Sequence, residues 1–213
     1  MVISIYANLT APLPGARQCK YTGQSVRVVP IRILTVGKKR SPGVQLIVDE
    51  YIRKLNHYCT VDDVQIRSNP RNASDARAQV DDEDTAMMNI IRSDDWVVML
   101  DENGQDIGSE QMAELVGDAG NTGASRLSFC IGGPYGHGRQ LRERANISIK
   151  LSTLVLNHQI ALLVLMEQLY RPGYELVATR FSNGVRSDID YMFGCNPIFS
   201  RRTGEVTLLP SFL

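Results

Sequence analysis

Long apolar runs are missing from this chain of 213 residues. The longest uninterrupted one, Ile160 to Met166, is far shorter than the roughly 20 residues that a membrane-spanning helix needs. We therefore expect no membrane-spanning helix and no membrane partner. With 43% hydrophobic residues, the chain can bury one sizeable core, so a single folded domain is the expectation.

Cysteine is scarce, and the four cysteines are widely scattered. They are Cys19, Cys59, Cys130 and Cys195. They form no Cys-x-x-Cys pair and no cluster with histidine. Zinc sites and disulfide frameworks need ligands or partners at recognisable spacings, so neither is indicated. We expect reduced thiols and no metal.

Acidic residues are absent from the first 48 positions, which carry seven basic side chains. Residues 49–118 carry six basic and seventeen acidic side chains, and residues 119–213 carry ten and six, so the net charges are +7, −11 and +4. Residues 1–29 are therefore predicted to be an extension outside the fold. Their composition resembles an organellar transit peptide, for a chloroplast or a mitochondrion. The alternative is a disordered basic arm on a cytoplasmic protein.

The standard nucleotide-binding motifs are also missing, although a glycine-dense loop follows an apolar strand at residues 131–138. The loop lacks the Gly-Lys-Ser/Thr ending of a phosphate-binding loop, and its glycines do not match the dinucleotide fingerprint. This disfavours an ATPase, a dehydrogenase or another small-molecule nucleotide enzyme. Gly132 and Gly133 still allow backbone amides to approach a ligand closely, or else they only permit a tight turn.

Strand and helix signals alternate along the rest of the chain. Strands are expected at residues 30–36, 61–66, 95–100, 127–131 and 153–156, and helices at 42–55, 74–91, 109–116, 138–145 and 158–171. This order predicts an α/β fold with a mostly parallel sheet flanked by helices. Ligands bind such sheets beyond the carboxyl ends of strands, here expected at Leu100, Ile131 and Leu156.

Several boundaries rest on single residues. Ser41 should cap the first helix, and Ser109 should cap the third, which Gly117 would end. A polar turn at 101–104 should end the third strand, and Pro172 with Gly173 should break the last helix. The second helix should bury an apolar face: Ala76, Val80, Met87, and Ile90 or Ile91.

Three separate segments together resemble the pseudouridine methyltransferases of the large ribosomal RNA, which are members of the SPOUT class. They are the glycine loop Ile131-Gly-Gly-Pro-Tyr-Gly136, the segment from Ile149 to His158, and Glu167-Gln-Leu-Tyr-Arg171. Residues 31–38 and 97–101 are also similar to that family. The resemblance covers about residues 30–171, which we take as the catalytic domain, and leaves residues 172–213 as a divergent, poorly ordered tail.

The resemblance implies a homodimer with a deep trefoil knot in its C-terminal part. It implies that S-adenosylmethionine binds in the knot and that a ring nitrogen of a pseudouridine in ribosomal RNA, on the assembled ribosome or as free RNA, is methylated. Carried over by position, the cofactor contacts are Leu100, Gly132, Leu151, Ser152, Thr153, Leu154, Val155 and Leu156.

The nitrogen of an imide must lose its proton before it attacks a methyl group, so a base is needed. His158 is the candidate catalytic base, with capping of the last helix as its alternative role. His137 is expected in an exposed loop. Three cations are candidates for RNA contact, or else form a solvated helix face: Arg139, Arg142, Arg144. The apolar last helix belongs to the core or to a dimer seam.

Two features depart from the family. Leu162 stands where many members carry an arginine, and the closing Tyr-His pair of the family is missing from this chain. The primary prediction is an active RNA methyltransferase that uses S-adenosylmethionine. The alternative is a catalytically impaired homodimer that binds the cofactor or the ribosome.

Overall fold

Five strands form the centre of the computed structural model, which describes residues 29–68 and 75–181, with side chains as far as Arg171. The strand order in the sheet is β2-β1-β4-β3-β5, and each of the four strand pairings is parallel. The strands are β1 (Ile31–Gly37), β2 (Val61–Arg67), β3 (Asp95–Asp106), β4 (Arg126–Ile131) and β5 (Ile147–Lys150). The predicted parallel α/β sheet is confirmed.

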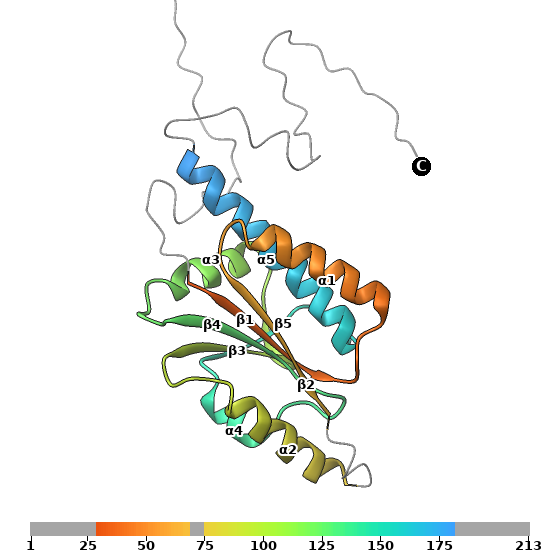
Figure 1. Cartoon of the computed structure of the whole chain (residues 1–213). Helices are drawn as coiled ribbons and strands as arrows, with labels where there is room; N and C mark the ends of the chain where they lie inside the picture. Colours follow the sequence, from red (N-terminus) through yellow and green to blue (C-terminus); the bar gives the residue numbers. More distant parts are fainter. Residues whose placement is uncertain (1–28, 69–74, 182–213) are drawn as a thin grey trace, which may run out of the picture. The chain divides into compact units, whose positions relative to one another are not determined.

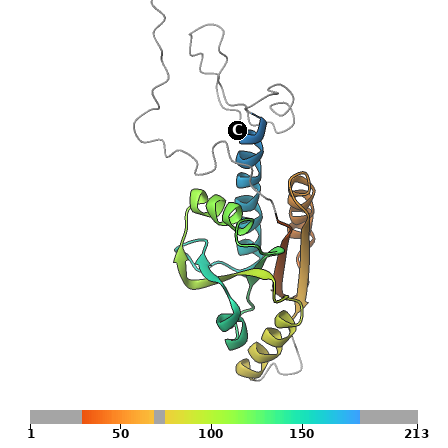
Figure 2. The same cartoon turned by 90° about the vertical axis from the view of Figure 1, so that its left-hand side faces the viewer.

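Helices cover both faces of this sheet (Figure 1, Figure 2). They are α1 (Pro42–Leu55), α2 (Ala76–Met88), α3 (Ser109–Ala119), α4 (Arg139–Arg144) and α5 (His158–Phe181). Buried side chains of α1, α3 and α5 share one core cluster with the sheet, whereas those of α2 and α4 belong to a second cluster. No helix within the described ranges is long and apolar enough to cross a membrane.

Apolar side chains that point alternately to the two faces of the sheet fill both core clusters. In β1, Ile31 and Ile33 pack into the α1, α3 and α5 side, whereas Leu34 and Val36 pack into the α2 and α4 side. Successive side chains of a strand point to opposite faces, so a strand that is apolar at nearly every position must be covered twice. The near-continuous apolar sequence of β1 is therefore the reason that it lies inside the sheet, between β2 and β4.

The first helix begins as predicted. The Ser41 hydroxyl accepts a hydrogen bond from the Val44 N–H, and Pro42 occupies the first turn, where its missing N–H costs nothing. Helices α1 and α5 run side by side on the same face, where the rings of Tyr51 and Tyr170 meet edge to face with centroids 6.1 Å apart (Figure 1).

The expectations for the third and fifth strands were wrong. Strand β3 does not end in a polar turn at 101–104 but runs on to Asp106, with an irregularity after which Gln105 pairs with Ile149. Strand β5 is Ile147–Lys150 and not residues 153–156. Pairing with β3 selects the alternating Ile147 and Ile149, and leaves the later apolar residues in a loop.

Two helices also differ from the sequence prediction. Helix α3 is capped by Gly108, whose N–H donates to the Gln111 side chain, and it continues through the buried Gly117 to Ala119. Helix α2 buries Met87 together with three polar side chains, Gln79, Glu83 and Asp84, while Ala76 is exposed. Asp84 is bonded to two N–H groups of α4, and Gln79 and one oxygen of Glu83 are bonded to Ser68 and to each other, whereas the other Glu83 oxygen has no hydrogen-bond partner among the described residues.

The last helix passes through Pro172 and ends at Phe181, so the predicted break is wrong. A proline removes one backbone donor from a helix and favours a kink, which does not oblige the chain to leave the helix. Of the expected extension 1–29 and the expected tail 172–213, residues 1–28 and 182–213 lie outside the described residues.

Candidate active site

The carboxyl ends of β1, β4 and β5 lie beside Leu100, in the middle of β3, at one edge of the sheet. Leu100 of β3 pairs with Ile131 of β4 on one side and with Ile149 of β5 on the other, and Ile131 also pairs with Thr35 of β1. The residues that follow these positions are therefore neighbours in space: Gly37, Gly132, Leu151. This edge is where a parallel sheet places its ligands.

The glycine loop turns sharply at this edge. The Gly136 N–H donates to the Gly133 carbonyl at 3.1 Å, and Gly136 has a φ of +82°, which a residue with a side chain rarely adopts. Gly132, a predicted cofactor contact, lies against the carbonyl of Gly136 and the ring of His137. The turn thus packs the loop tightly onto itself directly after β4.

His137 connects the glycine loop to β3, which corrects the expectation that it is exposed. Its side chain is buried, and Nε2 lies 2.8 Å from the Leu100 carbonyl oxygen. Because a carbonyl only accepts, Nε2 carries the hydrogen and donates it. Burial lowers the pKa of His137 below its ordinary value, so the ring is neutral near pH 7. Two predicted cofactor contacts, Leu100 and Gly132, are thereby held together.

The three candidate RNA-binding arginines lie in different environments. Arg139 has a largely exposed side chain and pairs with Glu143 at 2.6 Å. Arg142 donates to Asp101 at 2.7 Å and to the His137 carbonyl. Arg144 donates to three backbone carbonyls, those of residues 92, 93 and 95, and so fastens α4 to the start of β3. Arg139 is the most available of the three for an anion.

Asp101 has a shifted pKa because of this arrangement. Burial raises the pKa of the carboxyl, but hydrogen bonds from the Asn103 N–H and from Arg142 outweigh burial and lower the pKa below its ordinary value. Asp101 therefore stays ionised next to Leu100 and holds Arg142 beneath the glycine loop.

The predicted cofactor segment, Leu151 to Leu156, follows β5 as a loop at the same edge. Leu154 is 74% exposed and Val155 is 83% exposed, which is unusual for large apolar side chains. The Ser152 hydroxyl accepts from the Leu154 N–H at 2.9 Å and so fixes the turn. The segment presents apolar side chains and backbone groups that a ligand or a second chain would cover.

His158 is the first residue of α5, and its ring lies against Gly37 at the end of β1. Its Nε2 atom is buried and has no hydrogen-bond partner within the described part of the chain. Burial, and then the charge of Arg40, lower the pKa of His158 below its ordinary value. The alternative role as a helix cap is filled by Asn157, whose side chain accepts from the Gln159 N–H at 2.9 Å.

A buried ion pair lies close to His158. Arg40 follows β1, and its side chain is only 3% exposed, with Nη2 donating to Asp63 of β2 at 2.7 Å. The same nitrogen is 3.4 Å from the Thr35 hydroxyl. Breaking a buried pair leaves an uncompensated charge, so the loop between β1 and α1 is fixed in place beside the candidate base.

Sequence reasoning missed two buried carboxylates on α2. Asp84 accepts hydrogen bonds from the N–H groups of Gln140 and Leu141, at 2.8 and 2.9 Å, and so caps α4. Glu83 accepts from Ser68 and Gln79, and its other oxygen lies against Gly133. The available signal was the spacing of Gln79, Glu83 and Met87, which recur every four residues on one face of α2.

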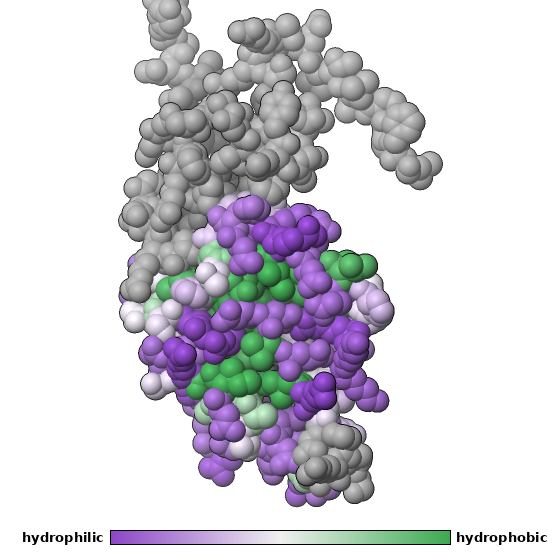
Figure 3. Space-filling view, in the orientation of Figure 1, coloured by the Kyte–Doolittle hydropathy of each residue, from purple (hydrophilic) through white to green (hydrophobic). Residues whose placement is uncertain are grey.

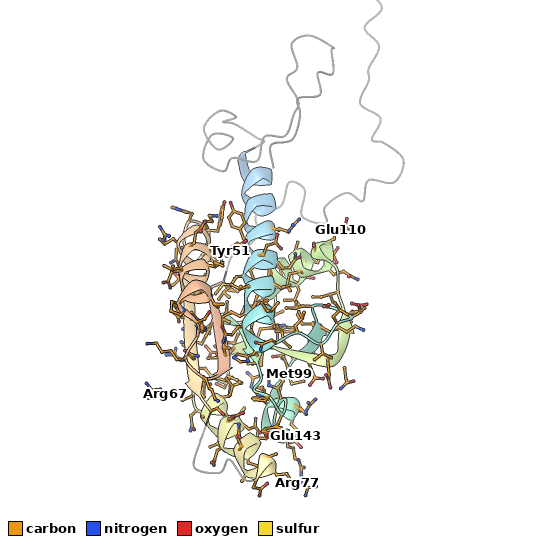
Figure 4. The ribbon with its side chains drawn as sticks, turned by 90° about the vertical axis from the view of Figure 1, so that its right-hand side faces the viewer. Tyr51, Arg67, Arg77, Met99, Glu110 and Glu143 are labelled. Atoms are coloured by element: carbon orange, nitrogen blue, oxygen red, sulfur yellow. The ribbon has the colours of Figure 1, made fainter. Side chains whose placement is uncertain are left out.

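An open groove of about 500 Å³ lies between α2, the glycine loop and α4, and we call it the α2–α4 groove. Figure 4 shows Arg77 and Glu143 on its two helices, at the end of the domain opposite Tyr51 and Glu110. Ten residues line it: Ala76, Arg77, Val80, Asp81, Tyr135, His137, Gly138, Arg139, Arg142, Glu143. His137 thus belongs both to the groove and to the site at the strand ends around Leu100 and Gly132, which we call the strand-end site.

Known proteins resemble this chain over most of its length. The Clostridium novyi ribosomal RNA large subunit methyltransferase H is 33% identical over 145 residues, which cover 66% of this chain and 91% of that protein. An Arabidopsis thaliana protein, named provisionally as an RNA methyltransferase, is 65% identical over 181 residues, which cover 80% of this chain and 94% of that protein.

Among solved structures, the SpoU methyltransferase AviRb from Streptomyces viridochromogenes, crystallised with its cofactor AdoMet, matches with a TM-score of 0.35 and 14% identity. The match covers 69% of this chain and 59% of AviRb, and a likeness this distant carries no weight for the site. The family model described as "Predicted SPOUT methyltransferase" matches residues 29–175. The strand-end site with its glycine loop therefore lies within the matched region, and the chain belongs to the SPOUT methyltransferase family.

Proposed function

We propose that this chain transfers a methyl group from S-adenosylmethionine to a ring nitrogen of a pseudouridine in large-subunit ribosomal RNA. The observation that carries the proposal is the meeting of the carboxyl ends of β1, β4 and β5 beside Leu100 of β3. The parallel pairings around Leu100 bring Gly132 and the start of the segment 151–156 to that edge, and His158 lies there against Gly37 at the end of β1.

The residues at this edge fit S-adenosylmethionine. The exposed apolar side chains of Leu154 and Val155 suit the adenine ring, and Gly132 is partly exposed, so its backbone groups can reach a ligand. When bound, the cofactor supplies a methyl group that its positively charged sulfur activates. No acidic group is needed for that activation, so the apolar character of the segment is compatible with the reaction.

His158 accepts the proton in the proposed reaction. Its lowered pKa keeps the imidazole neutral near pH 7, which is the form that can act as a base. His158 would take the proton of the pseudouridine ring nitrogen, whose electron pair would then be free to accept the methyl group that bound S-adenosylmethionine would supply. The charge of Arg40, which is itself paired with Asp63, adds to burial in keeping the His158 ring neutral.

Ribosomal RNA is the proposed substrate because the similar Clostridium novyi protein is named as a ribosomal RNA large subunit methyltransferase. Arg139, which is largely exposed, is the foremost RNA contact of the three predicted arginines. The formal net charge of the chain is zero, so affinity for RNA must come from a local patch or from an assembled dimer.

A homodimer with a trefoil knot in its C-terminal part belongs to the same proposal. Leu154, Val155 and Ile160 are 74%, 83% and 48% exposed and lie within seven residues of one another. Figure 3 shows the hydrophobic residues of one face gathered in two areas separated by hydrophilic ones. A second copy that covered the start of α5 would remove such side chains from water and close the cofactor segment.

The test is transfer of labelled methyl from S-adenosylmethionine to ribosomes that lack the modification, using the full chain. Label in the large-subunit RNA is the expected result. His158→Gln should lower the rate constant by about 10²- to 10⁴-fold with little change in cofactor affinity. His57→Gln, on an exposed histidine after α1, is the matched control and should keep full activity.

A chain that binds the cofactor and yet transfers no label would contradict the proposal. It would favour the impaired homodimer and direct attention to the missing Tyr-His ending. Full activity of His158→Gln, with label still entering the RNA, would show that His158 is not the base. The proposed methyltransferase activity would still hold.

We also propose that residues 1–29 direct the protein to a chloroplast or mitochondrion, on the composition of that segment alone. A fluorescent protein fused after residue 29 should enter one of these organelles in plant cells. A diffuse cytoplasmic signal would refute the targeting role and favour the basic-arm alternative.

A further inference from the structure

The α2–α4 groove has the size and position of a binding site next to the proposed reaction. Its volume of about 500 Å³ lies within the roughly 300–1,000 Å³ typical of ligand sites. His137 lines the groove and also contacts Leu100, while Tyr135 lies three residues beyond Gly132. None of the predicted cofactor contacts lines the groove, so it is separate from the cofactor segment.

The groove presents an exposed aromatic ring. Tyr135, at the tip of the glycine loop, is 57% exposed. Exposed aromatic rings beside cationic side chains are the usual platform for unpaired bases of single-stranded RNA. Ala76 and Val80 of α2 add an apolar wall to the same groove.

The charges of the groove favour an anionic ligand. Three arginines and two acidic residues line it, which leaves a net charge of +1. Arg139 pairs with Glu143 and Arg142 pairs with Asp101, whereas the Arg77 side chain has no ion-pair partner among residues 29–68 and 75–171. Arg77 is exposed, so its charge is available to a phosphate.

We propose that the α2–α4 groove holds an unpaired nucleotide that neighbours the target in the RNA substrate. Its base stacks on Tyr135, and its phosphates lie at Arg77 and Arg139. The inference rests on the proposed function for the identity of the RNA, but the groove itself makes a separate prediction about RNA binding.

The probe is a fluorescein-labelled 12-nucleotide uridine RNA, titrated with the full chain and followed by polarisation. Tyr135→Ser should weaken binding about 5- to 150-fold, the range found for loss of one stacked base, whereas Tyr135→Phe should bind within about twofold of the unchanged protein. Arg77→Ala should weaken binding and reduce the salt slope by about one. Arg53→Ala, an exposed arginine on α1, is the matched control and should change neither.

Calorimetric titration with S-adenosylmethionine separates this inference from the proposed function. Unchanged cofactor affinity in Tyr135→Ser, together with weaker RNA binding, supports the groove even if no methyl transfer is found. Equal RNA binding by Tyr135→Ser and Tyr135→Phe, or no RNA binding by the unchanged protein, overturns it. A loss of cofactor affinity without a loss of RNA binding would assign the groove to the cofactor instead.

Discussion

Gly37 is the residue against which the candidate base packs. A Cβ atom at this position would lie 2.9 Å from the Nε2 atom of His158, so an alanine forces the imidazole to move. We expect Gly37→Ala to reduce methyl transfer strongly and to cost about 1–3 kcal/mol of unfolding free energy. The measurements are the transfer rate constant and urea unfolding.

Gly43→Ala is the matched control for Gly37→Ala. No atom lies within 4 Å of a Cβ atom at Gly43, which is exposed in the first turn of α1. We expect full activity and a gain of about 0.4–1 kcal/mol in stability. Equal activity of the two variants would show that the position of His158 does not matter for transfer.

His137 should make stability depend on pH. Burial lowers its pKa from the ordinary 6.5, so the native state keeps the ring neutral while the unfolded chain takes up a proton below about pH 6.5. The unfolding free energy should therefore fall as the pH drops from 7.5 through 6.5 toward the native pKa. The pKa of His158 is also lowered, so this ring adds to the same fall in unfolding free energy at lower pH.

Urea unfolding of the unchanged chain and of His137→Gln at pH 7.5, 6.5 and 5.5 measures this dependence. The variant should lose less stability than the unchanged chain over that interval, because one of the two titrating rings is gone. Identical losses in both proteins would rule out a contribution from His137. The carboxylates with lowered pKa, such as Asp101, lose their contribution at more acidic pH.

At the scale of elements, α4 depends on α2 for its start. It is only six residues long and is preceded by Gly138, which offers no capping side chain. Asp84 supplies the cap from 56 and 57 positions away. Asp84→Asn should cost about 0.5–2 kcal/mol, because the charge at the helix N-terminus and one acceptor are lost.

Thermal unfolding of Asp84→Asn against Asp81→Asn tests this cap. Asp81 lies on the same helix but is exposed, so its substitution should leave the midpoint nearly unchanged. A similar midpoint for both variants would show that the Asp84 carboxylate does not stabilise α4.

Elements whose signals are local were predictable. The run from Ile31 to Val36 specifies β1, and Ser41 with Pro42 specifies the start of α1, because these effects act within a few residues. The fifth strand was predicted in the wrong place because pairing with β3 decides it, and β3 lies some 50 residues earlier. The polar face of α2 was missed because its partners lie on α4 and on Ser68, which follows β2.

At the scale of the whole molecule, the apolar side chains around the start of α5 predict association. Ile160 is 48% exposed, and we expect the full chain to be a dimer by analytical ultracentrifugation. Ile160→Arg should shift it toward monomer, because a charge in an apolar interface core must be desolvated. Asn121→Arg, on the exposed turn after α3, is the control and should remain dimeric.

A monomeric unchanged chain at micromolar concentration would contradict this prediction and would leave Leu154 and Val155 for the cofactor or RNA to cover. A dimer that tolerates Ile160→Arg would place the interface elsewhere. Leu162, which stands on α5 where many family members carry an arginine, is fully buried in the core, so it contributes packing and not a surface contact.

The sequence by itself determined the class of fold, the family and the segments that carry the site. Apolar periodicity, caps and the glycine-rich loop are properties of neighbouring residues, so they can be read without coordinates. Only the tertiary structure decided that His137 is buried on Leu100, that Asp84 caps α4, and that β3 continues to Asp106. Each of these depends on groups that the fold brings together from 37 or more positions apart, and that proximity is set by strand pairing and packing.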